Sequence, residues 1–309
     1  LIGTQAGENL TDAYYSIAIG QEALKTAAAG EHYNIAIGSF ALKSENSNAE
    51  GCVAIGHKAL EDQDIAAANN VAVGYNAALN LSTGTDSVYM GYLAGGAGVI
   101  EGDNNVAIGR SAALNATDMS RSVFIGYFAG GTGEVAGASN VCVGATAGYQ
   151  LTSGASNVLI GEAAGLNITS GGENVIIGKG ACGSGILANA SSTQGMYNVA
   201  IGPQSGQDLT SGQANILLGK DAGANLTAGS NNICLGAFTL DAADTGTARS
   251  NNIAIGNAAL SGQTADCTYC VAIGDSALVL QDADVKNTAI GGLAGATIST
   301  SDGNCFVGY

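Results

Sequence analysis

Residues 104–115 read NNVAIGRSAALN, and close relatives of this stretch return along the whole chain. YNIAIGSFALK occupies residues 33–43, NVLIGEAAGLN residues 157–167 and NNIAIGNAALS residues 251–261. We number each copy from its central glycine, which is position 0. This glycine occurs at residues 3, 20, 38, 56, 74, 91, 109, 126, 144, 161, 178, 202, 219, 236, 256, 274, 291 and 308.

Successive position-0 glycines keep a 17–18-residue period over most of the chain. The spacing is wider between Gly178 and Gly202 and between Gly236 and Gly256. A fixed short period indicates a repeat architecture in which each unit packs on its neighbours. We therefore expect a single array over residues 1–309 of about 17 coils, with longer coils at 179–202 and 237–256. Because solenoids need polar end caps and neither end resembles one, we interpret the chain as a segment of a longer fibre.

Positions −3 and −1 predict one short strand in every copy. Position −1 is always apolar, and position −3 is Val or Ile except at Thr288 and Cys305. Alternate residues of a strand share one face, and β-branched residues favour the extended conformation. We expect these two columns to point into a core, which a unit this short can bury only by stacking. The sequence thus predicts an all-β fold, a parallel β-solenoid or β-roll with 17–18-residue coils.

Three further columns describe the rest of the coil. Position +3 is Ala in nearly every copy, which with the glycine at position 0 indicates a bend where backbones approach closely. One Leu or Ile then follows, either directly, as at Leu24, or further on, as at Leu151, and we expect it in the interior. Position −4 is Asn in twelve of seventeen copies, which predicts a ladder of amides bonded to neighbouring amides or to the turn backbone.

Position −2 carries no charged residue in any copy. On a lone solenoid we expect this column to face solvent, so its apolar character indicates a second buried face. The simplest cover is another copy of the chain packed side by side, and the alternative is a flat wet face of small residues. Under the first interpretation, Ala272→Asp breaks association and leaves the coil core intact. The predicted interface is Ala18, Ala36, Ala54, Ala72, Tyr89, Ala107, Phe124, Leu159, Ile176, Leu217, Ala254, Ala272, Ala289 and Phe306.

The motif NVAIG, with Ala three residues after its glycine, resembles the head repeats of trimeric autotransporter adhesins. Those heads are left-handed parallel β-rolls in homotrimers, and their coils are shorter than the coils expected here. The pattern N-x-A-I-G-x-x-A-L is also similar to the arrays of predicted phage and marine-virus tail fibres, which fit the longer period better. The likeness covers essentially the whole chain, and it implies a side-by-side homotrimer.

Composition narrows the function classes. The net charge is −16, with nine Lys plus Arg, and a surface of this sign repels nucleic acid. No apolar run approaches the roughly 18 residues of a membrane span. The two histidines, His32 and His57, have no catalytic or metal-ligand spacing, and the acidic residues do not recur in register as a pair of catalytic carboxylates would. We expect neither an enzyme nor a metal or other cofactor.

Two groups of residues could do more than build coils. Tyr75, Tyr92 and Tyr127 follow position 0 in nearly consecutive copies, with Arg110 between them. Such a row suits sugar stacking, a partner surface or packing between subunits. Most of the seven cysteines replace small residues of the repeat and are expected to be buried, and the CxxC at 267–270 has the spacing of a local disulfide but lacks the second pair of a zinc site.

The sequence therefore predicts a structural role. We expect the shaft or head of an extracellular homotrimeric fibre, either a viral tail fibre on the virion surface that positions a host-recognition tip or, alternatively, a bacterial surface adhesin that binds its ligand directly. A filament of the extracellular matrix is a third interpretation. The expected partner is the chain itself, and a host glycan or protein would be bound through regions outside this segment.

Overall fold

The computed structural model describes residues 1–10, 14–25, 32–43, 50–62, 68–96, 98–185, 187, 195–241, 249–262, 267–281, 286–298 and 301–309. Within these residues the chain consists of short strands joined by turns, with no helix. Successive strands pair in parallel, one strand from each repeat, from β1 to β8 and from β9 to β17. The predicted fold class, an all-β parallel β-solenoid with 17–18-residue coils, is confirmed.

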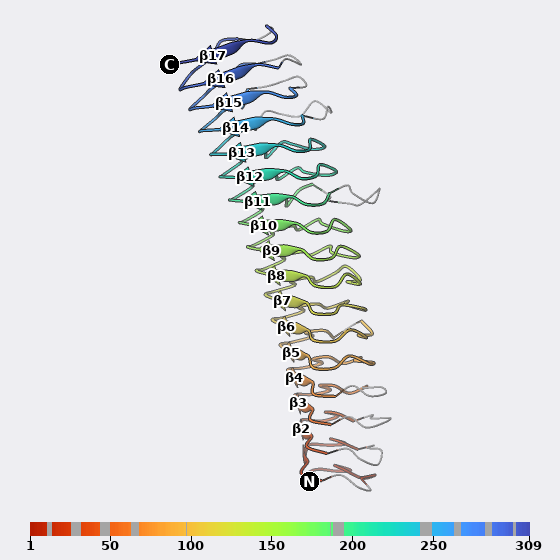
Figure 1. Cartoon of the computed structure of the whole chain (residues 1–309). Coiled ribbons are helices and arrows are strands. Elements are labelled where there is room, and N and C mark those ends of the chain that lie inside the picture. The colour runs from red at the N-terminus through yellow and green to blue at the C-terminus, as the bar shows by residue number, and fades with distance from the viewer. Residues whose placement is uncertain are drawn as a thin grey trace. The chain divides into compact units, whose positions relative to one another are not determined.

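The chain forms two compact units, residues 1–154 and 155–309. Each unit is a stack of coils with its strands pointing the same way, as Figure 1 shows. Unit 1 contains β1 (Ile17–Ile19), β2 (Ile35–Ile37), β3 (Val53–Ile55), β4 (Val71–Val73), β5 (Val88–Met90), β6 (Val106–Ile108), β7 (Val123–Ile125) and β8 (Val141–Val143). Unit 2 contains β9 (Val158–Ile160), β10 (Val175–Ile177), β11 (Val199–Ile201), β12 (Ile216–Leu218), β13 (Ile233–Leu235), β14 (Ile253–Ile255), β15 (Val271–Ile273), β16 (Thr288–Ile290) and β17 (Cys305–Val307).

Equivalent positions of the repeat lie directly above one another. Ala18 pairs with Ala36 in unit 1, and Ile176 pairs with Ala200 in unit 2. The ladder continues through the corner after each strand, where the N–H of Gly38 donates to the carbonyl of Ile19 at 2.7 Å. Every coil therefore offers the next one the same row of backbone donors and acceptors.

The glycine at position 0 forms the corner because no other residue fits there. Gly219 has a φ of +141°, a conformation that residues with a Cβ avoid. A Cβ at this position would also overlap the carbonyl group of Gly236 in the adjacent coil. Both constraints recur at the position-0 glycines from Gly3 to Gly126 in unit 1 and from Gly161 to Gly291 in unit 2, so the repeat of this glycine reflects stacking as well as backbone geometry.

The side chains at position −2 lie inside the coil, not outside it. From Ala18 in β1 to Ala289 in β16 every one of them is fully buried within the single chain, and only Phe306, in β17, is partly exposed. Positions −3 and −1 point outward and remain half-exposed. The expectation that positions −3 and −1 form the core is therefore wrong, and the interface predicted at position −2 is instead the solenoid interior.

The interior is filled by pairs of residues of complementary size at positions −2 and +4. Where position −2 is Tyr89 or Phe124, position +4 is Gly95 or Gly130, and a Cβ on either glycine would collide with the aromatic ring. In β1, β2 and β3, position −2 is Ala and position +4 is a fully buried Leu, whereas the coils of β4 and β6 have a fully buried Ala at both positions. Each coil thus reaches the close packing of protein interiors by its own combination of large and small residues.

The asparagines at position −4 form the predicted ladder. In unit 2, Oδ1 of Asn198 accepts from the backbone N–H of Asn215 at 3.1 Å and from its Nδ2 at 3.0 Å. Nδ2 of Asn198 also donates to the carbonyl of Gly212 at 2.9 Å, which closes the turn. Serine preserves the acceptor in unit 1, where Oγ of Ser122 accepts from the N–H of Asn140 at 3.1 Å. These amides are buried and bonded, so they stabilise the stack from inside.

The corner geometry predicts that even a methyl side chain at position 0 strongly lowers the free energy of unfolding. We expect Gly219→Ala to lower the free energy of unfolding by at least about 3 kcal/mol, because the methyl group meets both a forbidden φ and the backbone of the next coil. Gly180→Ala is the matched control: its φ of +64° is left-handed, but its Cβ would meet nothing closer than 3.8 Å. Here we expect a loss of only about 1 kcal/mol. Denaturant unfolding measures both values, and equal losses would contradict the stacking argument.

The paired sizes at positions −2 and +4 predict that a second substitution at position +4 can restore stability that is lost by a substitution at position −2. We expect Phe124→Ala to cost about 3–5 kcal/mol by leaving a cavity. Adding Gly130→Leu should recover more than half of this loss, because leucine occupies position +4 in other coils at the same backbone angle; Leu24 has a φ of 51° and Gly130 a φ of 58°. Gly130→Leu alone should destabilise by overpacking. A double-mutant cycle measures the coupling, and additive effects would refute the complementarity.

Candidate functional surfaces

The side chains at positions −3 and −1 form what we call the outer apolar face of each unit. In unit 1 all sixteen of them, from Ile17 in β1 to Val143 in β8, are Val or Ile except Met90. The five most exposed of them include Ile19, at 38%, and Ile125, at 36%, and the others are partly buried. In unit 2 the face is interrupted only near its last strands, by Thr288 and Cys305. Neither face contains a charged residue.

This face is larger than a soluble monomer normally leaves uncovered. Because five of the sixteen side chains are at least 36% exposed and the others are partly buried, the face leaves several hundred and at most about 1,000 Å² of apolar surface on unit 1, whereas the largest patch on a typical monomer is roughly 300–600 Å². A standard protein interface covers about 800 Å² on each partner. The outer apolar face therefore has the size and composition of an interface.

The position +1 side chains of unit 1 form a continuous row, which we call the +1 row: His57, Tyr75, Tyr92, Arg110 and Tyr127. The rings of Tyr75 and Tyr92 stack with centroids 5.4 Å apart and an interplanar angle of 12°. His57 stacks on the other face of Tyr75 at 5.2 Å. The structure thus brings the four residues singled out in the sequence into one surface, together with a histidine that the sequence analysis did not include.

Arg110 lies between two tyrosine rings of this row. Its Cζ atom is 5.5 Å from the centroid of Tyr92 and 5.8 Å from that of Tyr127. The row is continued by Phe40, which packs edge-on against His57, and by Phe128, which packs edge-on against Tyr127. Because the rings cover one another's faces, mainly their edges and polar tips reach solvent. The prediction of face-to-face sugar stacking therefore does not fit Tyr75 and Tyr92.

A second row, next to Phe40, consists of ion pairs. Lys25 pairs with Glu8 and Glu22 at 3.4 Å, and Lys43 links Glu22 to Glu61 at 3.4 and 4.0 Å. Lys58 completes the series with a 2.8 Å contact to Glu61. Three of these five pairs join adjacent coils, and two, Lys25–Glu22 and Lys58–Glu61, lie within one coil, so the row adds a modest attraction both within and between coils. We assign this row to stability.

The cysteines and acidic residues do not converge on a reaction centre in the part of the chain that the structure describes. No group of three or more His, Cys, Asp or Glu side chains there could hold a metal ion. Cys267 and Cys270 form a disulfide, one of the two states that the sequence left open. Burial raises the pKa of Cys182 and Cys234 to about 12, so both stay protonated and unreactive at neutral pH.

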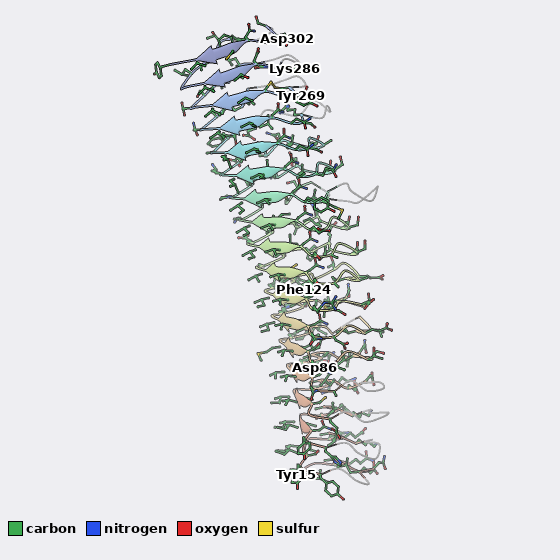
Figure 2. The ribbon with its side chains drawn as sticks, in the orientation of Figure 1. Tyr15, Asp86, Phe124, Tyr269, Lys286 and Asp302 are labelled. Carbon is green, nitrogen blue, oxygen red and sulfur yellow. A yellow bond between two sulfur atoms is a disulfide. The ribbon has the colours of Figure 1, made fainter. Side chains whose placement is uncertain are left out.

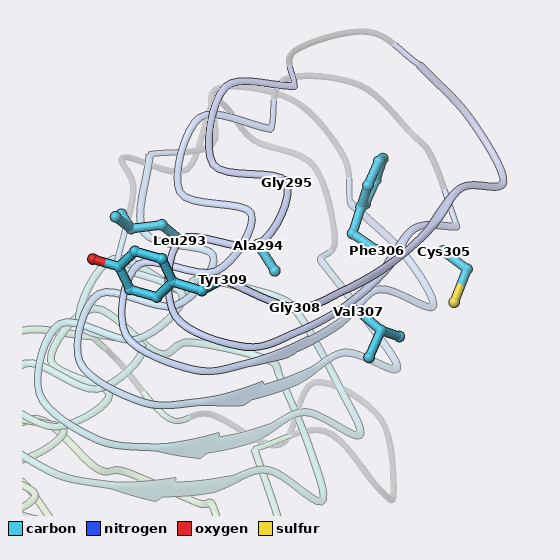
Figure 3. A pocket seen from close by; sticks show the side chains of 8 residues that line it. All are labelled: Leu293, Ala294, Gly295, Cys305, Phe306, Val307, Gly308 and Tyr309. Carbon is cyan, nitrogen blue, oxygen red and sulfur yellow. The ribbon is translucent and has the colours of Figure 1, made fainter.

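A hollow of about 410 Å³ opens at the last coil of unit 2 (Figure 3). It is lined by Leu293, Ala294, Gly295 and residues 305–309. Ala294, Gly295, Phe306 and Gly308 are interior or corner positions of the repeat, whereas Cys305 and Val307 belong to the outer apolar face. In the preceding coils the interior is filled by side chains at positions −2 and +4, so the hollow coincides with the interior of the last described coil.

The two longer coils, 179–202 and 237–256, lie partly outside the described residues, at 186, 188–194 and 242–248. Their interpretation as inserted or binding loops stays a prediction. Within the described part of the chain, no helix is long and apolar enough to cross a membrane.

No protein-family model matches the sequence, and no curated protein matches it significantly. The assignment of a function therefore depends on the surfaces described above. Of these, the outer apolar face extends along every strand, whereas the +1 row is confined to unit 1.

One carboxyl group predicts a measurable pH dependence. Burial, followed by the nearby Asp221 carboxylate, raises the pKa of Asp241 to about 6, although an amide N–H of Asn225 opposes the shift. Since the folded state binds this proton more tightly than the unfolded chain, its stabilising contribution is complete at low pH and is lost as the pH rises through about 6. We expect Asp241→Asn to raise the melting temperature at pH 7.5 but to have little effect at pH 4. An Asp241 carboxyl that titrates in the ordinary aspartate range by NMR would contradict this.

Proposed function

We propose that the chain is a structural segment, shaft or head, of an extracellular homotrimeric fibre. In its simplest form this is a viral tail fibre that holds a host-recognition tip away from the particle. The observation that carries the proposal is the outer apolar face, which runs along the strands and is too large to remain in water. The fibre role is mechanical and requires no catalytic group.

The coil architecture suits a load-bearing element. Within each unit, backbone hydrogen bonds, buried amides and a close-packed interior repeat at every coil. Such a stack resists bending and stretching, because any deformation must break several bonds of the same ladder together. The disulfide between Cys267 and Cys270 agrees with an oxidising, extracellular setting.

The outer apolar face supports self-association, and the resemblance of the repeat favours three copies in the assembly. Three copies that turn this face toward a common axis would bury it in a closed arrangement, and rotational closure prevents open-ended aggregation. The repeat resembles the heads of trimeric autotransporter adhesins, and its longer period resembles the arrays of viral tail fibres. The three-fold axis would then lie against positions −3 and −1, in place of the position −2 column that the sequence suggested.

A second candidate function is favoured by the +1 row. In a bacterial surface adhesin the side of the trimeric head would itself bind a host ligand, and a line of half-exposed polar tips on unit 1 offers such a surface. The two candidates differ in a simple observation. An adhesin head prepared from this chain alone should assemble and bind host cells, whereas a fibre shaft prepared in the same way should assemble but not bind them.

The absolute mass in solution tests the assembly. We expect light scattering to give three chain masses at micromolar concentration, because the outer apolar face drives association. Ile125→Asp, combined with Ile108→Asp on the neighbouring strand, should yield a folded monomer. Ser153→Asp, an exposed polar position of the same unit, is the matched control and should leave the trimer intact.

Two results would contradict the proposal. A soluble monomer of the unmodified chain would mean that the outer apolar face stays uncovered, and a trimer that persists in the double Asp variant would mean that another surface holds it. Ala272→Asp no longer tests the interface, because Ala272 is fully buried inside β15. An unpaired buried charge at this position is expected to destabilise the coil itself by several kcal/mol, about 3–5.

A further inference from the structure

We propose that Arg110, held between Tyr92 and Tyr127, is the binding site for the carboxylate of a short acidic saccharide. The saccharide hydroxyls would bind the neighbouring tyrosine tips of the +1 row. The inference concerns the side of unit 1 in a single chain, and it does not depend on the trimeric assembly proposed above.

The first argument is the unused hydrogen-bonding capacity of Arg110. A guanidinium group carries five N–H donors. Among the described residues, no acidic side chain forms an ion pair with Arg110 and no side-chain hydrogen bond involves it, and the residue is exposed. Lys25, Lys43 and Lys58 differ in this respect, because each pairs with a glutamate. Arg121 also lacks an ion pair among the described residues, but Arg110 differs from it in being held between two tyrosine rings.

The second argument is preorganisation. The two flanking rings contact Arg110 from both sides, at 5.5 and 5.8 Å, so its guanidinium is held by two cation–π contacts. The rings are themselves fixed, because Tyr75 supports Tyr92 and Phe128 supports Tyr127. A side chain already held in its binding conformation loses little rotamer entropy when a ligand arrives, and the planar guanidinium matches a carboxylate in bidentate geometry.

The third argument concerns what surrounds the cation. Tyr75, Tyr92 and Tyr127 are 48%, 47% and 49% exposed, and they lie on both sides of the cation along the stack of coils. Neighbouring rings and Arg110 cover the faces of Tyr75 and Tyr92, so the exposed parts of these two residues are ring edges and phenolic hydroxyls, which donate and accept hydrogen bonds. Such an edge suits a ligand rich in hydroxyl groups. It offers no bare ring face to an apolar ligand.

The net charge of the chain favours a short ligand with one carboxylate over a long polyanion. A chain with a charge of −16 repels a polyanion along most of its surface, so a long acidic polysaccharide is disfavoured. One carboxylate on an otherwise neutral saccharide meets the single cation of the +1 row and adds little repulsion elsewhere. A terminal acidic sugar on a glycan has this chemistry.

The test compares acidic and neutral saccharides of the same size. Two probes, 3′-sialyllactose and the methyl glycoside of glucuronic acid, are titrated into the folded chain, and each is compared with its carboxyl methyl ester. Binding is followed by calorimetry and by tyrosine fluorescence, which is free of tryptophan background because the chain contains no Trp. We expect saturable binding of at least one acid and binding of its ester that is weaker by at least about tenfold.

Variants locate the site. Arg110→Gln should weaken binding of the acid at least about tenfold, whereas Arg121→Gln, the control, should leave the affinity unchanged. Arg121 is also an exposed arginine of unit 1 without an ion pair among the described residues, but no cation–π contact to it is present there. Tyr127→Leu should weaken binding several-fold by releasing one side of the guanidinium. Thermal unfolding confirms that each variant is folded.

Several outcomes would overturn the proposal. Absence of saturable binding for both acids, equal binding of acid and ester, or equal losses in Arg110→Gln and Arg121→Gln would each refute a carboxylate site at Arg110. A change of solution mass in Arg110→Gln would overturn it too, because the +1 row would then lie between copies of the chain. The binding results do not bear on the outer apolar face, which is tested separately by the Asp variants on β6 and β7.

Discussion

Close stacking of one position-0 glycine on the next is the constraint on which the rest of the coil depends. Because neither corner carries a Cβ, successive strands align in register, and every other column is brought directly above its equivalent. Alignment places each asparagine amide within reach of the next, and it places the +1 side chains at stacking distance. Figure 2 shows how the side chains of each unit follow the strands in regular rows. A side chain at the corner would separate the coils, and all of these contacts would weaken together.

Much of this fold could be predicted from the sequence, because the period fixes what stacks on what. The strands, the corner glycines and the amide ladder follow from columns that change little between copies. The sequence did not predict correctly which face of each strand points inward, because Val and Ile at positions −3 and −1 look like core residues when a single copy is considered. The missed signal is a correlation: Tyr89 and Phe124 occur with Gly95 and Gly130, whereas Ala at position −2 can occur with Leu at position +4. Two positions need to compensate for each other's side-chain size only when their side chains pack in the same interior.

The +1 row was visible in the sequence as a run of tyrosines at equivalent positions of the repeat, and the structure brings the predicted members together. What the sequence could not give is the environment of Arg110, because cation–π geometry and the lack of an acidic neighbour depend on side-chain conformations. His57 was also missed as a member of the same surface, since aromatic character alone did not separate it from ordinary variation in the turn.

The in-register pairing of every coil with the next has an evolutionary consequence. When one whole period is inserted or deleted, the coils on either side meet the same surface as before, because each coil presents the same donors, acceptors and corner. Unequal recombination between copies can therefore lengthen or shorten the protein without a change of fold, provided that the exchange keeps positions −2 and +4 within the same coil. The number of repeat copies in the gene then sets the number of stacked coils in the protein. This number is inherited and can change by one coil at a time.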